Sequence, residues 1–440
     1  MKKRFVLVCV VLVVTLAVIY LYRYRRPLNM EGKVPVQATQ VVHLNLRQIE
    51  HHLLMDVIKS PFEFSSSGKS KMNQDGIGLN DVITIPRNIF FYTNTSTLKN
   101  GWFSNKIKVK DVGKLHEYLL KQGFKTETGK QFVKDRIVIG VSANDAIIAY
   151  RIADDSIHIV LSNLIDNNDY QNEDDLIVRT LSNATSDITY TSTGGDSLNA
   201  NFKKGAFEIL GELNTDLFLT NEFAVTESSI AAFNTKINKE HRVFKSLFKH
   251  LDKEKFREFS KLSMDSIVNK WDGSVVFDLK QIDEKIDTII TYEYDDDFNR
   301  IEKQSVQKQL IPNFTLQLGE GEELTEYFYK KNMAKLVEGD TVFVGMPLYK
   351  TYFSNSDNRL LLSSQNNSSI RLQGQTSYKL YSHIAVNKYL KTPLEYVDFS
   401  NKPFADKINI ISITLTVDNK LAVKITLNET EQNFVTTLVE

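Results

Sequence analysis

The chain has 440 residues and a mass of 50.4 kDa, which exceeds the size at which one hydrophobic core usually stops growing. Its formal charge is zero, but residues 1–30 hold six basic residues and no acidic one, so the remainder carries 48 basic against 54 acidic residues. A mildly acidic body lacks the clustered positive field that phosphate binding needs, so we expect no nucleic-acid partner. The hydrophobic fraction of 42% excludes global disorder, and the single cysteine, Cys9, excludes an intramolecular disulfide and a cysteine-based zinc site.

The N-terminal residues 1–30 are predicted to be a signal anchor. Residues 5–22 carry no charge, and at 1.5 Å per residue a helix of this length spans roughly 27 Å, about one hydrocarbon core. A cleavable signal peptide is the alternative, but no small-residue cleavage site follows the apolar stretch. The basic residues at the N-terminus favour a cytoplasmic start. The sequence therefore predicts a single-pass protein of the bacterial inner membrane with its C-terminal body in the periplasm.

A short tether, residues 31–38, leads into a first predicted α+β unit, residues 39–165. A helix is expected at 112–122 in this unit, because Asp111 can cap its first turn and Gly123 can end it. The other elements expected in this unit are a helix that begins after Asn45 and strands at 40–44, 83–93, 102–110, 136–141, 146–152 and 157–161.

A polar linker, residues 166–198, is predicted to separate this unit from a second one, residues 199–440. Residues 226–272 place Phe and Leu at helical spacing and predict a helical insertion packed on a sheet. Residues 408–427 alternate apolar and polar side chains on both sides of Asp418-Asn419, which predicts a C-terminal hairpin.

Four short matches in the same order indicate an internal repeat, at offsets of roughly 185 to 209 residues. The matched segments are LHEYLL (115–120) with LTEYFY (324–329), IVIGV (137–141) with VFVGM (342–346), 79–91 with 264–277, and 150–163 with 352–366. The predicted fold class is therefore α+β, with an N-terminal transmembrane helix followed by two similar units, each an antiparallel sheet with helices.

Several segments together resemble a bacterial cell-envelope family. They are the basic N-terminal anchor, VVHLNLRQIEHHLL from Val41, WDGSVVFDL from Trp271, and a closing stretch that begins ITLTVDNKLAVKITL at Ile413. Members of that family are membrane-tethered or lipid-anchored proteins catalogued as domains of unknown function. The resemblance covers most of residues 39–440 and implies a fold and a compartment but no catalytic residue. The chain lacks a usable lipobox around Cys9, so the resemblance implies anchoring by a helix.

The strongest candidate for metal chemistry is the acidic run that contains Asp295 and Asp297. A D-x-D sequence after an apolar strand can hold a divalent cation and a nucleotide-sugar diphosphate, with both carboxylates on one face. A hairpin turn is the reading we favour, because Asp and Asn are ordinary turn residues and no glycine-rich phosphate loop accompanies them. The histidines lack metal-binding spacing, and no nucleophile motif is present. The sequence therefore predicts no catalytic residue, no cofactor and no metal.

These observations favour a non-enzymatic envelope protein that binds another protein or a ligand, or that forms a structural part of an extracytoplasmic assembly. It would contact the membrane through residues 5–22. Two other functions remain open at this point. One is a metal-dependent, membrane-anchored transferase that uses Asp295 and Asp297, and the other is a lipid carrier whose apolar strands line a groove, since strand alternation alone does not distinguish a groove from a closed core.

Overall fold

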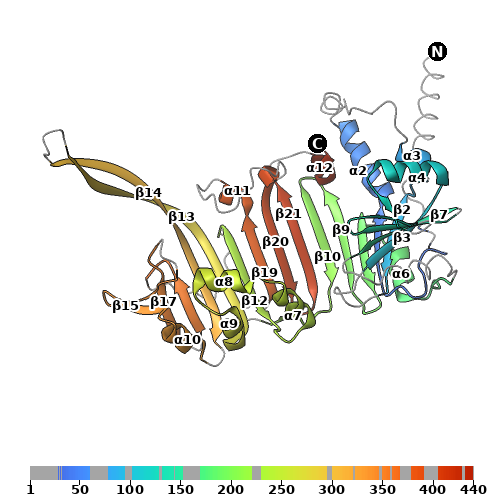
Figure 1. Ribbon diagram of the computed structural model, residues 1–440. Helices are drawn as coiled ribbons and strands as arrows, with labels where there is room; N and C mark the ends of the chain where they lie inside the picture. Colours follow the sequence, from blue (N-terminus) through green and yellow to red (C-terminus); the bar gives the residue numbers. More distant parts are fainter. Residues whose placement is uncertain are drawn as a thin grey trace, which may run out of the picture. The chain divides into compact units, whose positions relative to one another are not determined.

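Figure 1 shows the computed structural model of the chain. By their contacts the residues divide into two compact units, Met1–Asn214 with Thr430–Glu440 (unit 1) and Thr215–Glu429 (unit 2). The residues that the structure describes are 28, 30, 32–59, 78–94, 102–127, 131–142, 144–151, 169–220, 229–294, 300–320, 323–345, 349–356, 359–366, 378–390, 405–428 and 432–439.

The described strands of unit 1 form an antiparallel sheet. They are β1 (Gln40–Asn45), β2 (Asn88–Thr93), β3 (Trp102–Lys108), β4 (Lys125–Thr126), β5 (Gln131–Lys134), β6 (Ile137–Val141), β7 (Asp145–Arg151), β8 (Ile188–Ser192), β9 (Ser197–Lys203) and β10 (Ala206–Glu212). Their pairing gives the order β10-β9-β8-β1-β2-β3-β7-β6-β5-β4.

Short helices accompany this sheet, and local signals fix their ends. Asp111 Oδ1 accepts a hydrogen bond from the backbone N–H of Lys114 (3.0 Å) at the start of one helix, and Gly123 follows its end with φ of +83°. The helices of unit 1 are α2 (Leu46–Lys59), α3 (Leu79–Val82), α4 (Val112–Lys121), α6 (Leu176–Ser182) and α12 (Phe434–Val439).

Helices cover both faces of the β6–β7 region, and each encloses a separate core. Leu115 of α4 packs in one cluster with Ile139, whereas Leu181 of α6 packs in another cluster with Val138. Successive residues of a strand point to opposite faces, so neighbours on β6 enter different cores. The apolar run of β6 is therefore buried on both sides, which explains why its residues do not alternate with polar ones.

A buried carboxylate joins the last helix of unit 1 to the first. Asp56 on α2 accepts hydrogen bonds from the backbone N–H of Asn433 and from Thr436 Oγ1, both at 2.6 Å. The Oδ1 atom of Asn433 caps α12 by accepting from the backbone N–H of Val435 (3.0 Å). Two polar groups of the C-terminal segment thus bond to Asp56, which holds α12 against α2.

The described strands of unit 2 also form an antiparallel sheet. They are β11 (Phe218–Leu219), β12 (Ala231–Ile237), β13 (Trp271–Tyr294), β14 (Arg300–Glu320), β15 (Ala334–Val337), β16 (Asp340–Phe343), β17 (Tyr352–Ser356), β18 (Arg359–Ser363), β19 (Tyr378–Ala385), β20 (Ile408–Thr416) and β21 (Lys420–Leu427). Their order is β21-β20-β19-β12-β13-β14-β18-β17-β16-β15, and β11 pairs with the end of β12.

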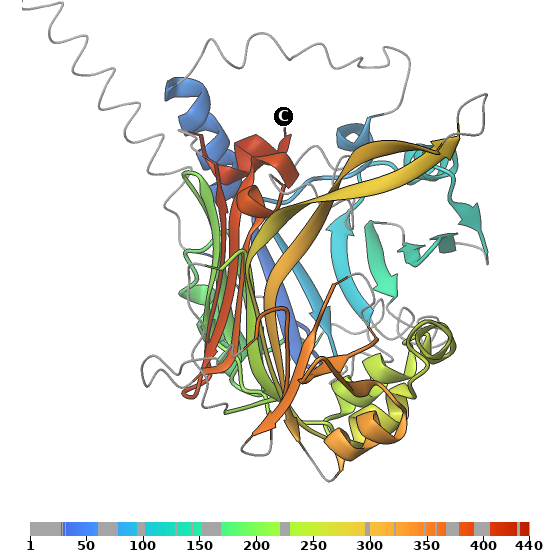
Figure 2. The same ribbon diagram turned by 90° about the vertical axis from the view of Figure 1, so that its left-hand side faces the viewer.

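Helix α11 (Val386–Leu390) lies at one end of these strands, beside β20, whereas most helices of unit 2 gather at the opposite end (Figures 1 and 2). Leu324 and Phe328 pack there with Trp271, Phe353 and Leu360 in one apolar cluster. The helices are α7 (Arg242–Lys249), α8 (Lys253–Ser260), α9 (Met264–Lys270), α10 (Leu324–Lys330) and α11 (Val386–Leu390), with a 3₁₀ turn at Ala405–Lys407.

The two units share one strand order. Numbered along each unit, with unit 2 counted from β12, the described strands follow the order 10-9-8-1-2-3-7-6-5-4 in both. The units differ in their helices and in the hairpin of the second and third strands. The described strands of this hairpin share a single residue pair in unit 1, whereas in unit 2 strands of 24 and 21 residues pair along most of their length, with two shifts of register.

The predicted fold class, α+β with two sheet-plus-helix units, is wrong. Antiparallel strands predominate over helices. Strand β12 lies inside the predicted helical insertion 226–272. Strands β13 and β14, of 24 and 21 residues, follow it. The division between the units falls after Asn214, and the predicted linker 166–198 contains α6 and β8 of unit 1.

The predicted membrane topology is not supported. Within the described ranges no helix is long and apolar enough to cross a membrane. The 14 residues of α2, the longest helix in those ranges, span roughly 21 Å, against about 30 Å of hydrocarbon. The expected transmembrane segment, residues 5–22, lies outside the described residues. The assignment as a single-pass inner-membrane protein with a periplasmic body is therefore withdrawn.

We predict that Asp56→Ala detaches α12 selectively. The change leaves the Asn433 N–H and the Thr436 hydroxyl without their acceptor in a buried site, at a cost of about 3 kcal/mol in all. Hydrogen exchange of a peptide that covers 434–439 should accelerate by about two orders of magnitude. A peptide from β20 and β21 of unit 2 should exchange as in the unchanged protein. Glu173→Ala, which removes an exposed carboxylate, serves as the control. Unchanged protection of α12 would contradict the prediction.

Candidate ligand-binding site

The sheet of unit 1 is split between β2 and β3. β2 pairs with β1 over six residues and β3 pairs with β7 over seven, but β2 and β3 share only the pair Tyr92 and Ser104. Further along β3, the partner is the segment before β2, where the Thr84 N–H donates to the Lys108 carbonyl (2.9 Å). Asn105 spans the gap by donating from Nδ2 to the Phe90 carbonyl (3.2 Å). The two strands therefore diverge around an opening instead of forming a ladder.

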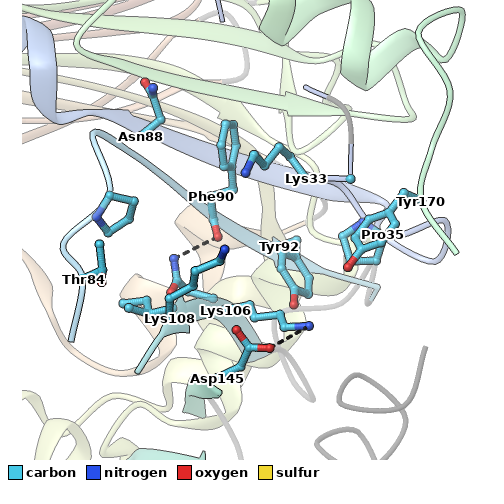
Figure 3. Close-up of a pocket in the computed structure, with 14 residues that line it drawn as sticks. Lys33, Pro35, Thr84, Asn88, Phe90, Tyr92, Lys106, Lys108, Asp145 and Tyr170 are labelled. Atoms are coloured by element: carbon cyan, nitrogen blue, oxygen red, sulfur yellow. Dashed lines mark hydrogen bonds and ion pairs between the residues drawn. The ribbon is translucent and has the colours of Figure 1, made fainter. Parts of the chain in front are cut away.

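A cavity of about 380 Å³ occupies this opening, and we call it the β2–β3 pocket (Figure 3). Its volume lies in the range of small-molecule sites. The groups that line it combine aromatic rings, amides, prolines and charges. They are Phe90, Tyr92 and Tyr170; Asn88 and Asn105; Pro35 and Pro86; and Lys33, Lys106, Lys108 and Asp145, among others.

Asn105 lines the pocket and carries a buried hydrogen-bond acceptor that is unused within the described residues. The residue is only 2% exposed, and its Nδ2 is engaged by the Phe90 carbonyl. Its Oδ1 is buried and makes no hydrogen bond within the part of the chain that the structure describes. A buried amide oxygen without a donor costs free energy, so such positions in proteins usually meet a water or a ligand. This oxygen has almost no accessible surface, so a ligand donor reaches it only if the side chains around it shift.

The rim of the pocket carries an excess of positive charge. Lys106 Nζ lies 3.4 Å from a carboxylate oxygen of Asp145, and Figure 3 shows this pair beside Tyr92. Lys33 and Lys108 are exposed, and among the described residues neither makes an ion pair. Three ammonium groups against one carboxylate favour an anionic ligand, and two of those ammonium groups are not neutralised by neighbours within the described ranges.

A buried histidine holds the wall formed by β2. His43 on β1 lies opposite Phe90 and stacks on its ring, with 4.8 Å between centroids and 14° between planes. His43 Nε2 is 3.0 Å from Oδ1 of Asn88, so the Nε2–H tautomer donates to this amide. Burial lowers the pKa of His43, against a smaller opposite effect of Asn88. The neutral ring therefore fixes two pocket residues without adding charge.

Tyr92 keeps its phenol neutral. Burial raises the pKa of Tyr92, and the nearby Tyr170 adds to this effect, whereas the Ser104 hydroxyl opposes it. A neutral phenol beside the lysine rim provides an apolar ring with one polar tip. Together with Phe90 it gives the pocket a flat aromatic wall against which a planar group can pack.

The residues that the sequence singled out do not form this site. Asp295 and Asp297 lie outside the described residues, between the end of β13 at Tyr294 and the start of β14 at Arg300. Within the described ranges, no three His, Cys, Asp or Glu side chains come together as a metal site. His52 Nε2 pairs with the buried Asp187 (3.0 Å), whose other oxygen accepts from the Phe202 N–H (2.6 Å). That cluster holds α2 to β8 and β9.

Sequence reasoning missed the pocket residues for an identifiable reason. Lys106 and Lys108 alternate with apolar residues at the end of β3, and Lys110 continues this pattern beyond the strand, which is the ordinary pattern of a half-solvated strand. That pattern does not show that β2 stops pairing with β3 along this part of the strand. The only local signal is Asn105, an amide inside a strand, because asparagine is depleted from strand interiors.

The chain matches no family model, no curated protein and no solved structure in the three comparisons made with known proteins.

We predict that His43 makes the folding stability of this chain depend on pH. Its pKa in the folded protein is lower than the value near 6.5 expected in the unfolded chain. The unfolded chain therefore binds the proton first as pH falls. The stabilisation from the neutral ring is fully present above about pH 6.5 and is lost progressively below it. Urea midpoints measured by circular dichroism at about pH 7.5 and pH 5.5 should differ less in His43→Gln than in the unchanged protein. His250→Gln, at an exposed position, should keep the original difference. Equal pH dependence of His43→Gln and the unchanged protein would refute the assignment.

Proposed function

We propose that this chain is a binding protein whose β2–β3 pocket takes a small anionic molecule that carries a planar apolar ring and an N–H or O–H donor. The observation that carries the proposal is a cavity with aromatic side chains and a lysine rim, with the buried, unpaired Asn105 Oδ1 beneath its lining. An unsatisfied acceptor at a fixed position, next to uncompensated positive charge, is the complement of a ligand with a donor and an anion.

Each feature of the ligand class has its own support. The aromatic rings of Phe90 and Tyr92 favour a flat apolar group, because such rings stack or pack edge to face. The ammonium groups of Lys33 and Lys108 favour a carboxylate, sulfonate or phosphate. The volume of about 380 Å³ limits the ligand to a small molecule. The groups on the wall are recognition groups, so binding is the activity that they support.

The proposal predicts that 8-anilinonaphthalene-1-sulfonate binds and becomes fluorescent, since it combines a sulfonate, an N–H and aromatic rings. The double change Lys33→Gln and Lys108→Gln should weaken its binding roughly tenfold, because each partly exposed ion pair contributes on the order of 1 kcal/mol or less. The same change should leave binding of N-phenyl-1-naphthylamine, the neutral analogue without sulfonate, within about twofold. Fluorescence titration of the full chain measures both.

The control is Lys335→Gln, an exposed lysine on β15 of unit 2, which should not alter either affinity. Raising the salt concentration should weaken binding of the sulfonate probe but not binding of the neutral probe, because salt screens exposed charges. If the sulfonate probe binds equally well after loss of both lysines, or if the two probes behave alike, the pocket does not select anions and the proposal is wrong.

A further inference from the structure

The hairpin of β13 and β14 extends beyond the sheet of unit 2 as a two-stranded arm (Figures 1 and 2). The last residue of β13 paired with β12 is Leu279, and the first residue of β14 paired with β18 is Thr315. Beyond these points residues 281–294 pair only with residues 300–313. At about 3.3 Å per residue the arm is roughly 45 Å long, and a two-stranded ribbon is only marginally stable by itself.

One face of the arm is apolar and open to solvent. Ile286 is 61% exposed, Ile290 and Tyr292 are each 47% exposed, and Val306 is 66% exposed. Residues directly opposite in the ladder share a face, and the pair Thr288 with Val306 places these side chains on one side. The register places more charged and polar residues on the opposite face, which holds Asp283, Lys285, Asp287, Thr291, Glu293, Lys303, Ser305, Gln307 and Gln309 beside Ile289, Ile301 and Ile311. A marginal ribbon with an exposed isoleucine stripe needs a second surface to cover it.

The distribution of charge on this face favours a second copy of the chain as its partner. Glu284 and Glu302 are balanced by Arg300 and Lys308, so the face has no net charge and favours neither a cationic nor an anionic partner. Its acids and bases are spread along the arm and not separated into a positive and a negative end. This arrangement is suited to a copy of itself turned by a two-fold axis.

The register shows how two copies would fit. We place a two-fold axis between two stacked arms, perpendicular to the strands and level with the pair Thr288 and Val306. Ile286 then faces Ile290 of the second copy, and Val306 faces Val306 of the second copy. Glu284 then faces Tyr292 of the second copy. The Arg300 guanidinium covers that ring at 3.4 Å from its centroid, so the carboxylate meets a cation.

The remaining charges also agree with this register. Lys308 faces the uncharged Gln304 of the second copy and lies one ladder step from its Glu302. No acid faces an acid and no base faces a base among these positions. A shift of the axis to Ile286 would instead bring the two Lys308 side chains opposite each other, because Lys308 pairs with Ile286. The charge pattern therefore selects the axis at Thr288 and Val306.

We propose that the arm is a dimerisation element, which packs face to face and antiparallel on the arm of a second copy of this chain. The apolar stripe supplies the contact, and the four charges fix its register. The inference concerns unit 2 and is independent of the ligand proposed for unit 1.

Sedimentation velocity of the full chain tests the proposal. At roughly 50 µM, a concentration at which a micromolar complex is largely formed, the unchanged protein should sediment as a dimer. Val306→Glu places two carboxylates against each other at the axis and should weaken association at least a hundredfold. Ser305→Glu adds the same charge on the opposite face of the same strand and should leave the dimer intact.

A crosslink checks the register separately. In a Cys9→Ser background, which removes the native cysteine, Val306→Cys should give a disulfide-linked dimer on mild oxidation, because this position faces itself across the axis. Ser305→Cys should not. A monomeric unchanged protein, a Val306→Glu variant that still dimerises, or equal crosslinking at both positions would overturn the proposal. The stated axis would also be excluded if Val306→Glu weakens the dimer but Val306→Cys gives no disulfide-linked dimer.

Discussion

Each β-strand carries backbone N–H and C=O groups along both edges, and a buried edge must find partners for them. This requirement orders the fold. Both units meet it with the same succession of antiparallel neighbours, and helices are added where faces would otherwise be exposed. The pairing of the two units differs most at one place, the hairpin of the second and third strands.

The two arrangements of this hairpin have opposite consequences. Between β2 and β3 the ladder is interrupted, so a side chain, Asn105, replaces the missing backbone partner and an enclosed space results. Between β13 and β14 the ladder continues past every neighbour, so each strand of the arm pairs along its inner edge only, and the side chains on one face are not covered. The gap in pairing leaves the cavity that we propose as a ligand site, and the excess of pairing leaves the exposed face that we propose as a dimer contact. One strand order therefore supports two kinds of recognition.

Local signals in the sequence predicted local structure well. Asp111 and Gly123 delimit α4, Asn45 caps α2 through the Gln48 N–H (3.1 Å), and the alternation on both sides of Asp418-Asn419 corresponds to β20 and β21. These features depend on residues close together in the chain, and each has a specific backbone or capping requirement.

Features that depend on distant neighbours were not predictable. The matched segments LHEYLL and LTEYFY both fall on the helix that follows the third strand of their unit. The segments IVIGV and VFVGM, in contrast, fall on the sixth strand of unit 1 and the fifth strand of unit 2, because a period of two gives any two apolar strands a similar pattern. The pocket results from the interrupted pairing of β2 and β3, and amino-acid composition does not show which strands pair. The apolar N-terminal residues 5–22 dominated the prediction of fold class and compartment, although they are a small part of the chain and lie outside the described residues.

The attachment of α12 has a consequence for synthesis. Asn433, which donates a hydrogen bond to Asp56, is synthesised 377 residues after it, and the whole of unit 2 is translated between the two. Unit 2 is contiguous and can fold as soon as it leaves the ribosome, whereas unit 1 stays incomplete until the final residues emerge. During that interval Asp56 and the Phe202 carbonyl lack their partners from the C-terminal segment. The oldest part of the nascent chain is thus the last to be finished, so ribosomes that stop early release a product with an intact unit 2 and an open unit 1.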